Sequence, residues 1–163
     1  MAEDLKAALE QGALGLSTGL AYRNALQAPT TEVDFLAAIL QDVGGIYVSH
    51  IRSEDNEIIE AIDEAIDIGR NAGVPVIISH LKCAGRGNWG RSEAIIGRID
   101  NARQQHPVGC DCYPYAASST TIDPRIVDEG FRIQITWSTP HPEMAGKNLK
   151  DIAALWNLSQ VDA

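Results

Sequence analysis

The chain has 163 residues, of which 45% are apolar and 21% charged, a composition that is ordinary for a globular protein with one hydrophobic core. Its 22 acidic residues outnumber the 13 basic ones, which argues against a nucleic-acid partner because phosphate binding requires clustered cations. No apolar run approaches the roughly 18 residues of a membrane span, and the first ten residues lack the features of a signal peptide. We therefore expect a soluble, cytoplasmic protein with no membrane partner.

Helices and apolar strands alternate along the chain. Amphipathic spacing predicts helices over residues 3–11, 31–42, 56–72 and 93–105. Thr31 and Ser92 are expected to cap two of these helices. Each helix is followed by an apolar run that predicts a buried strand, and the strands end near Thr18, His50, His80 and Asp111. A fifth candidate strand, 132–138, and a helix over 149–156 follow a poorly patterned stretch.

Successive strand ends are all separated by about 30 residues, which is the period of consecutive βαβ units in a parallel sheet. Such a sheet is either a (β/α)₈ barrel or an open doubly wound sheet. Polar, glycine-bearing loops after all four strands favour the barrel, because barrel enzymes place their chemistry there. A whole barrel needs about 200 to 250 residues, so we expect residues 1–163 to form a single incomplete catalytic-barrel domain. Its unpaired edges predict a homo-oligomer, aggregation, or a piece of something larger.

Two matching phrases, "IYVSHIRSE" and "VIISHLKCA", place His50 and His80 at the ends of successive strands. Two imidazoles at one mouth of a sheet suit a divalent metal, most of all zinc, although each could instead make a hydrogen bond in its loop. A catalytic zinc needs about three protein ligands, and the sequence offers two obvious ones. Cys110 and Cys112 are a weak further pair. We read all three cysteines as reduced thiols and His106 and His141 as loop residues.

Cations follow both histidines at the same distance. Arg52 and Lys82 each lie two residues beyond a histidine and could hold a carboxylate, or be solvated loop residues. The loop "CAGRGNWGRS" adds Arg86 and Arg91 beside a helix amino end, which can bind an anion, but it lacks the spacing of a nucleotide P-loop. Tyr113, just beyond the strand that ends near Asp111, could donate to a substrate oxygen or pack against its loop.

With these residues in hand, the chain resembles the central part of the N-acyl-D-amino-acid deacylases (D-aminoacylases) of the amidohydrolase superfamily. The matching stretches, in order over nearly the whole chain, are "GALGLSTGLAY", "YVSHIRSE", "EAIDEAIDIGRNAGVPVIISHLK", "GNWGRS", "DCYPYAASST" and "ITWSTPHPEMAGKNLKDIAA". The resemblance implies a zinc-dependent hydrolase of the amide bond of N-acyl-D-amino acids. It also implies a (β/α)₈ TIM-type barrel of which this chain holds about strands 4 to 7.

By this resemblance, His50 and His80 match metal-binding histidines of the family. Lys82 and Tyr113, with Arg52 as a weaker transfer, match positions near the small-molecule N-acyl amino acid. In the implied mechanism, zinc acidifies a bound water and polarises the acyl carbonyl, and an acidic residue shuttles the proton to the leaving amine.

Three parts of the family pattern have no counterpart in the sequence: an early HxH pair, a cysteine metal ligand and the catalytic aspartate. Some members also carry a histidine where Leu81 stands. We assign no catalytic residue here and expect this chain alone to hydrolyse nothing at a useful rate, since loss of the acid/base group typically costs about 10²- to 10⁴-fold. The alternative is a non-catalytic α/β module that binds a carboxylate or phosphate through the loop cations.

Overall fold

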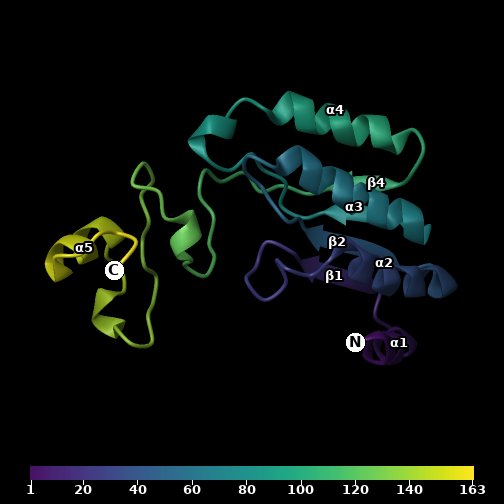
Figure 1. Ribbon diagram of the computed structural model, residues 1–163, viewed down its shortest axis with the longest axis horizontal. Coiled ribbons are helices and arrows are strands. Elements are labelled where there is room, and N and C mark those ends of the chain that lie inside the picture. Colours follow the sequence, from purple (N-terminus) through teal and green to yellow (C-terminus); the bar gives the residue numbers. More distant parts are fainter. The chain divides into compact units, whose positions relative to one another are not determined.

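A four-stranded parallel sheet organises the chain up to Pro114, and the computed structural model describes residues 1–163 (Figure 1). Its strands are β1 (Gly15–Gly19), β2 (Ile46–His50), β3 (Val76–Ile78) and β4 (Val108–Cys110). They pair in the order β1-β2-β3-β4, so each strand lies beside the next one in the sequence. A doubly wound sheet reverses its strand order at a switch point, and these four strands contain no reversal.

One helix connects each strand to the next. The connecting helices are α2 (Thr30–Ala38), which continues as a 3₁₀ turn over Ile39–Val43, α3 (Ile58–Ala72) and α4 (Ser92–Arg103), and a further helix, α1 (Ala2–Glu10), precedes β1. Helix α3 packs against both α2 and α4, so the helices follow one another in the order of the strands (Figure 1). This sequential order is that of a segment of a barrel wall, as the loop composition predicted.

The register of the sheet decides which side chains face the helices. Tyr47 pairs with Val76 and Ser49 with Ile78, and all four are buried. Four of the five isoleucines of α3 are buried in the same core, which follows from their recurrence on one face of the helix: Ile58, Ile62, Ile66 and Ile68. Alternation along a strand then directs the intervening side chains to the other face, where Val48 and Ile77 stay partly exposed.

The predicted helix caps are wrong in detail. Helix α2 begins at Thr30 after Pro29, and α4 begins at Ser92 after Arg91, and neither helix has a side-chain cap. A cap residue must itself be non-helical, whereas Thr31 and Ser92 already lie inside their helices. The hydroxyl of Thr30 instead donates to Glu64 of α3 at 2.7 Å, so a tertiary contact replaces the expected local one.

The second compact unit covers residues 115–163 and has few regular elements. Helix α5 (Leu149–Trp156) forms where it was predicted, and Leu149 and Ile152 are buried with Met144. The expected strand over residues 132–138 is wrong. Only a single antiparallel bridge joins Gln134 to Asn148, and Trp137 is 74% exposed. The segment has residues of high β-propensity, but it does not pair with a strand of a sheet. The division into two compact units does not test the prediction of one incomplete domain over residues 1–163, which stays a prediction.

None of the helices is both long and apolar enough to cross a membrane.

Candidate metal centre

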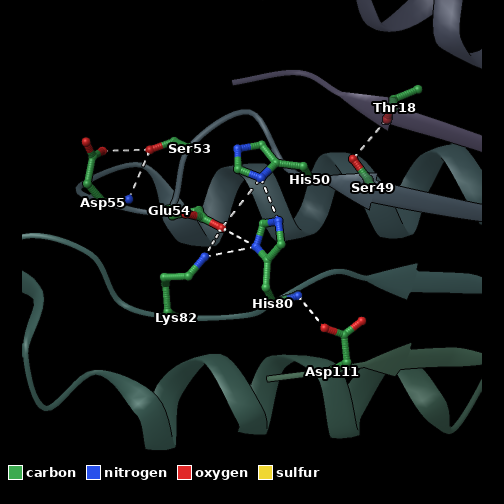
Figure 2. A network of polar contacts seen from close by, with 9 residues as sticks. All are labelled: Thr18, Ser49, His50, Ser53, Glu54, Asp55, His80, Lys82 and Asp111. Carbon is green, nitrogen blue, oxygen red and sulfur yellow. Dashed lines mark hydrogen bonds and ion pairs between the residues drawn. The ribbon is translucent and has the colours of Figure 1, made fainter. Parts of the chain in front are cut away.

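The side chains of His50 and His80 meet at the carboxyl ends of β2 and β3 (Figure 2). His50 Nδ1 lies 2.8 Å from His80 Nε2, and the ring centroids are 4.6 Å apart. The structure therefore brings together the two imidazoles that the repeated phrase singled out. Two ring nitrogens directed at one point are a donor set that suits a divalent metal such as zinc.

The register shows that this meeting requires more than strand alternation. Val48 pairs with Ile77 and Ser49 with Ile78, so a continued ladder would set His50 beside Ser79 and leave His80 one position further along. Since a shift of one residue moves a side chain to the opposite face of a sheet, regular alternation would place the two histidines on opposite faces. The chain avoids this at His80, whose φ of 40° lies in the left-handed region that residues with a Cβ seldom adopt.

Asp111 holds the turn at His80. Its carboxylate accepts a hydrogen bond from the backbone N–H of His80 at 2.7 Å, and its carbonyl accepts one from Leu81 at 2.8 Å. Its own N–H donates to the carbonyl of Ile78 at 3.1 Å. The residue directly after β4 thus fixes the backbone that directs His80 at His50. Such a conformation costs about 1 to 3 kcal/mol and persists only where neighbouring contacts impose it.

Glu54 joins the pair, and sequence reasoning missed it. Its Oε1 lies 2.8 Å from His80 Nδ1 and 3.9 Å from His50 Nδ1, so the ligand atoms of three residues lie within 4.8 Å of one another. Figure 2 shows the Glu54 carboxylate directed at both rings and at Lys82. Its position four residues after His50, in the same loop, was the signal that could have indicated it.

Lys82 also faces the histidines. Its Nζ donates to Glu54 Oε1 at 2.5 Å, lies 2.9 Å from His80 Nδ1, and stands 5.5 Å from the centre of the Tyr113 ring. Two of the three predicted substrate-binding residues, Lys82 and Tyr113, are therefore close to each other, and Lys82 adjoins the pair.

Arg52, the third of these residues, points elsewhere. Its guanidinium donates to both carboxylate oxygens of Glu64 at 2.8 and 2.9 Å, and to the carbonyls of Leu26 and Ala28 at 2.6 and 3.0 Å. These four hydrogen bonds join the loop before α2 to helix α3. The structure therefore does not bring Arg52 to the histidines.

An open hollow borders the two histidines. Its wall includes Ser17, Asn24 and Tyr22, whose ring stacks on His50 at a centroid distance of 4.9 Å. Burial lowers the pKa of His50, and this is opposed by the Glu54 carboxylate and reinforced by His80 and Lys82. A lowered pKa keeps this imidazole neutral at physiological pH, which is the form that ligates a metal.

The remaining candidates have other partners. Arg91 donates to Asn88 Oδ1 at 2.6 Å, and the amide nitrogen of Asn88 donates to Asn56 Oδ1 at 3.0 Å, which joins the glycine-bearing loop to the loop before α3. His106 contacts the carbonyl of Val74 at 2.8 Å. All three cysteines are free thiols, as expected. These contacts give the alternative of an anion-binding module little support.

Comparisons with known proteins point in one direction. The chain is 45% identical over 157 residues to an N-acyl-D-glutamate deacylase of Alcaligenes xylosoxydans xylosoxydans, a match that covers 96% of the chain and 32% of that protein. A crystal structure of D-aminoacylase, said to define a novel subset of amidohydrolases, superposes with a TM-score of 0.92 at 38% identity, over 99% of the chain and 36% of the other. No family model matches the chain.

A third relative carries a metal. The N-acyl-D-glutamate deacylase of Bordetella bronchiseptica, solved with zinc and a phosphonate inhibitor that mimics the tetrahedral intermediate, superposes with a TM-score of 0.91 at 43% identity. The superposition covers 98% of the chain and 34% of that structure.

The four-stranded sheet thus matches a segment of the barrel of a solved amidohydrolase. Within that class, the chain is homologous to the N-acyl-D-amino-acid deacylases and spans about a third of the length of the curated relatives it matches. These findings agree with the resemblance seen in the sequence.

Proposed function

We propose that this chain is the part of a zinc-dependent N-acyl-D-amino-acid deacylase that supplies two metal ligands and part of the substrate site. The observation that carries the proposal is the convergence of His50 Nδ1 and His80 Nε2 at 2.8 Å, in a chain 45% identical to an N-acyl-D-glutamate deacylase. In this proposal the four strands are a portion of a closed (β/α)₈ barrel, and the substrate is a small N-acyl amino acid.

We assign metal binding, substrate binding and loop stabilisation to different residues of the chain. His50 and His80 would hold the zinc, which supplies an activated water and polarises the acyl carbonyl. Lys82, whose ammonium lies beside His80 and 5.5 Å from the centre of the Tyr113 ring, would hold the substrate carboxylate, and Tyr113 would orient the amide. Arg52, which the sequence also suggested for this task, is engaged by Glu64, so we assign it to holding the loop before α2.

The chemistry also needs an acid/base group, and we assign none to this chain. Glu54 is already shared between Lys82 and the histidines. The catalytic aspartate that the resemblance implies has no counterpart in the sequence. We therefore expect the chain by itself to bind zinc without turning over substrate.

The experiment measures zinc content and hydrolysis on the same purified chain. About one zinc per chain, lost in His50→Ala and in His80→Ala, together with no measurable release of D-methionine or D-glutamate from the N-acetyl compounds, is the expected result. The absence of zinc in the unmodified chain would contradict the metal site. Chelator-sensitive turnover would contradict the assignment of the acid/base group outside the chain.

A further inference from the structure

One positive charge lies against the histidine pair. The Lys82 ammonium is 2.9 Å from His80 Nδ1, and its side chain is only 25% exposed. A divalent cation held between the two imidazoles would lie within a few ångströms of this ammonium. Like charges at such a distance repel strongly where solvent is partly excluded, so Lys82 by itself opposes metal binding.

Glu54 is the carboxylate that offsets this charge. Its Oε1 contacts Lys82 Nζ at 2.5 Å, and the Glu54 side chain is 17% exposed, less than the side chains of Lys82 and of both histidines. The other cation of the repeated phrase, Arg52, is instead neutralised by Glu64 of α3. Glu54 is therefore the carboxylate that balances the charge of Lys82 beside the histidines.

We propose that Glu54 is a positioning residue that neutralises Lys82 and fixes it beside the histidine pair, so that one site can hold both a divalent metal and a substrate-binding cation. The inference rests on the proposed function for the metal and for the role of Lys82. It differs from direct ligation by Glu54, in which the carboxylate would be needed whether or not Lys82 is present.

The test is a double-mutant cycle on the full chain, with Zn²⁺ as the titrant in isothermal titration calorimetry. The variants are Glu54→Gln, Lys82→Met and the two combined. Glu54→Gln is expected to weaken zinc binding about 10- to 100-fold, as removal of a supporting residue at a metal site typically does. Lys82→Met is expected to bind zinc at least as tightly as the unmodified chain, because the repulsive charge is gone.

The combined variant decides between the two roles of Glu54. If the carboxylate acts by neutralising Lys82, the double variant binds zinc within about twofold of Lys82→Met, since nothing remains to be neutralised. A double variant as weak as Glu54→Gln would overturn the proposal in favour of direct ligation. Zinc binding by Glu54→Gln equal to that of the unmodified chain would overturn it as well.

The matched control is Glu60→Gln, which removes the same charge from an exposed position on α3 and is expected to leave zinc affinity unchanged. If the unmodified chain binds no zinc, the proposed metal site is wrong, and the cycle is read from urea unfolding of the metal-free variants instead. Non-additive effects, with the double variant more stable than the sum of the single changes predicts, support neutralisation of Lys82 by Glu54. Additive effects overturn it.

Discussion

Residues 46–54 and 76–84 share one pattern, an apolar run followed by Ser-His, an apolar residue and a cation, but the two segments have different roles in the structure. In the first segment the strand continues regularly to His50, and the cation that follows, Arg52, is bound by Glu64 of α3 and by two loop carbonyls. In the second the strand ends two residues before His80, and the cation Lys82 lies beside the histidine ring.

The difference lies in the backbone at the second histidine. The pairing of Ser49 with Ile78 would direct His80 away from His50, and the left-handed turn held by Asp111 corrects it. One segment thus contributes a histidine and a clamp for the loop before α2. The other contributes a histidine and a cation that faces the candidate site. Four predictions test this contrast.

The largest effect is expected from removing either histidine. His50→Ala and His80→Ala should each weaken zinc binding by more than the roughly 100-fold upper range of supporting-residue changes, because each removes a ligand outright. His106→Ala is the control, since His106 contacts the backbone carbonyl of Val74 just before β3 begins and should keep full affinity. Calorimetric titration measures all three. Equal affinities in the three variants would show that the two segments hold no metal.

The two cations should differ in stability. Arg52→Met breaks four hydrogen bonds and leaves the Glu64 carboxylate, 14% exposed, without its cationic partner, so we expect a loss of about 2 kcal/mol, between the values for exposed and buried ion pairs. Lys82→Met should cost less, about 1 kcal/mol, because one carboxylate is its main partner. Urea unfolding monitored by circular dichroism compares them. A larger loss of unfolding free energy for Lys82→Met than for Arg52→Met would contradict the assignment of Arg52 to the fold and of Lys82 to the candidate site.

The strained backbone at His80 makes an unusual prediction. His80→Gly should be more stable than His80→Ala by about 1 kcal/mol, because glycine adopts a positive φ without the steric cost that a Cβ incurs. At His50, whose backbone belongs to the regular strand β2, the order should be reversed, with alanine more stable than glycine. The same order at both positions, by thermal or urea unfolding, would contradict the difference between the segments.

The smallest effect concerns acid stability on the Arg52 side. Burial raises the pKa of Glu64, but hydrogen bonds from Arg52 and Thr30 more than offset this and hold the pKa below its ordinary value of 4.5. A depressed folded-state pKa contributes stability above the unfolded value that is lost as pH falls through the folded one. Below about pH 4.5 the unmodified chain should therefore lose up to about 1 kcal/mol relative to Glu64→Gln. For Glu60→Gln, the difference in free energy of unfolding from the unmodified chain should stay constant in urea unfolding between pH 6 and pH 3.

Much of the fold could be predicted because it depends on local patterns. The isoleucine spacing located α3, and glycines Gly44 and Gly73 end their helices with φ of 63° and 67°. Recurring apolar runs located the four strands. The pattern failed where its outcome depends on distant partners. The run over residues 132–138 has strand-like composition, yet it finds only one bridging residue in Asn148.

The sequence predicted which residue types form the site better than it predicted how their side chains are arranged. His50 and His80 were found from their repeated context, but aligning the two phrases on their histidines implied a shared phase that the sheet register does not have. Glu54 and Asp111 were not found, because the second segment has Ala84 at the position that matches Glu54, and Asp111 lies outside both segments. Both residues matter because they contact His80, which follows a different strand, and local sequence spacing does not predict such contacts.

By itself the sequence determined the strand and helix order, the strand period and the two histidines, since these follow from side-chain periodicity and residue chemistry within each strand-and-helix unit. Only the tertiary structure decided that His80 turns toward His50, that Arg52 faces α3 while Lys82 faces the histidines, and that Glu54 stands among them. The physical reason is that a strand fixes its side-chain directions only as far as its hydrogen-bonded ladder extends. Beyond its last residue, the path of the chain is set by hydrogen bonds to other segments, and these exist only once the sheet has formed.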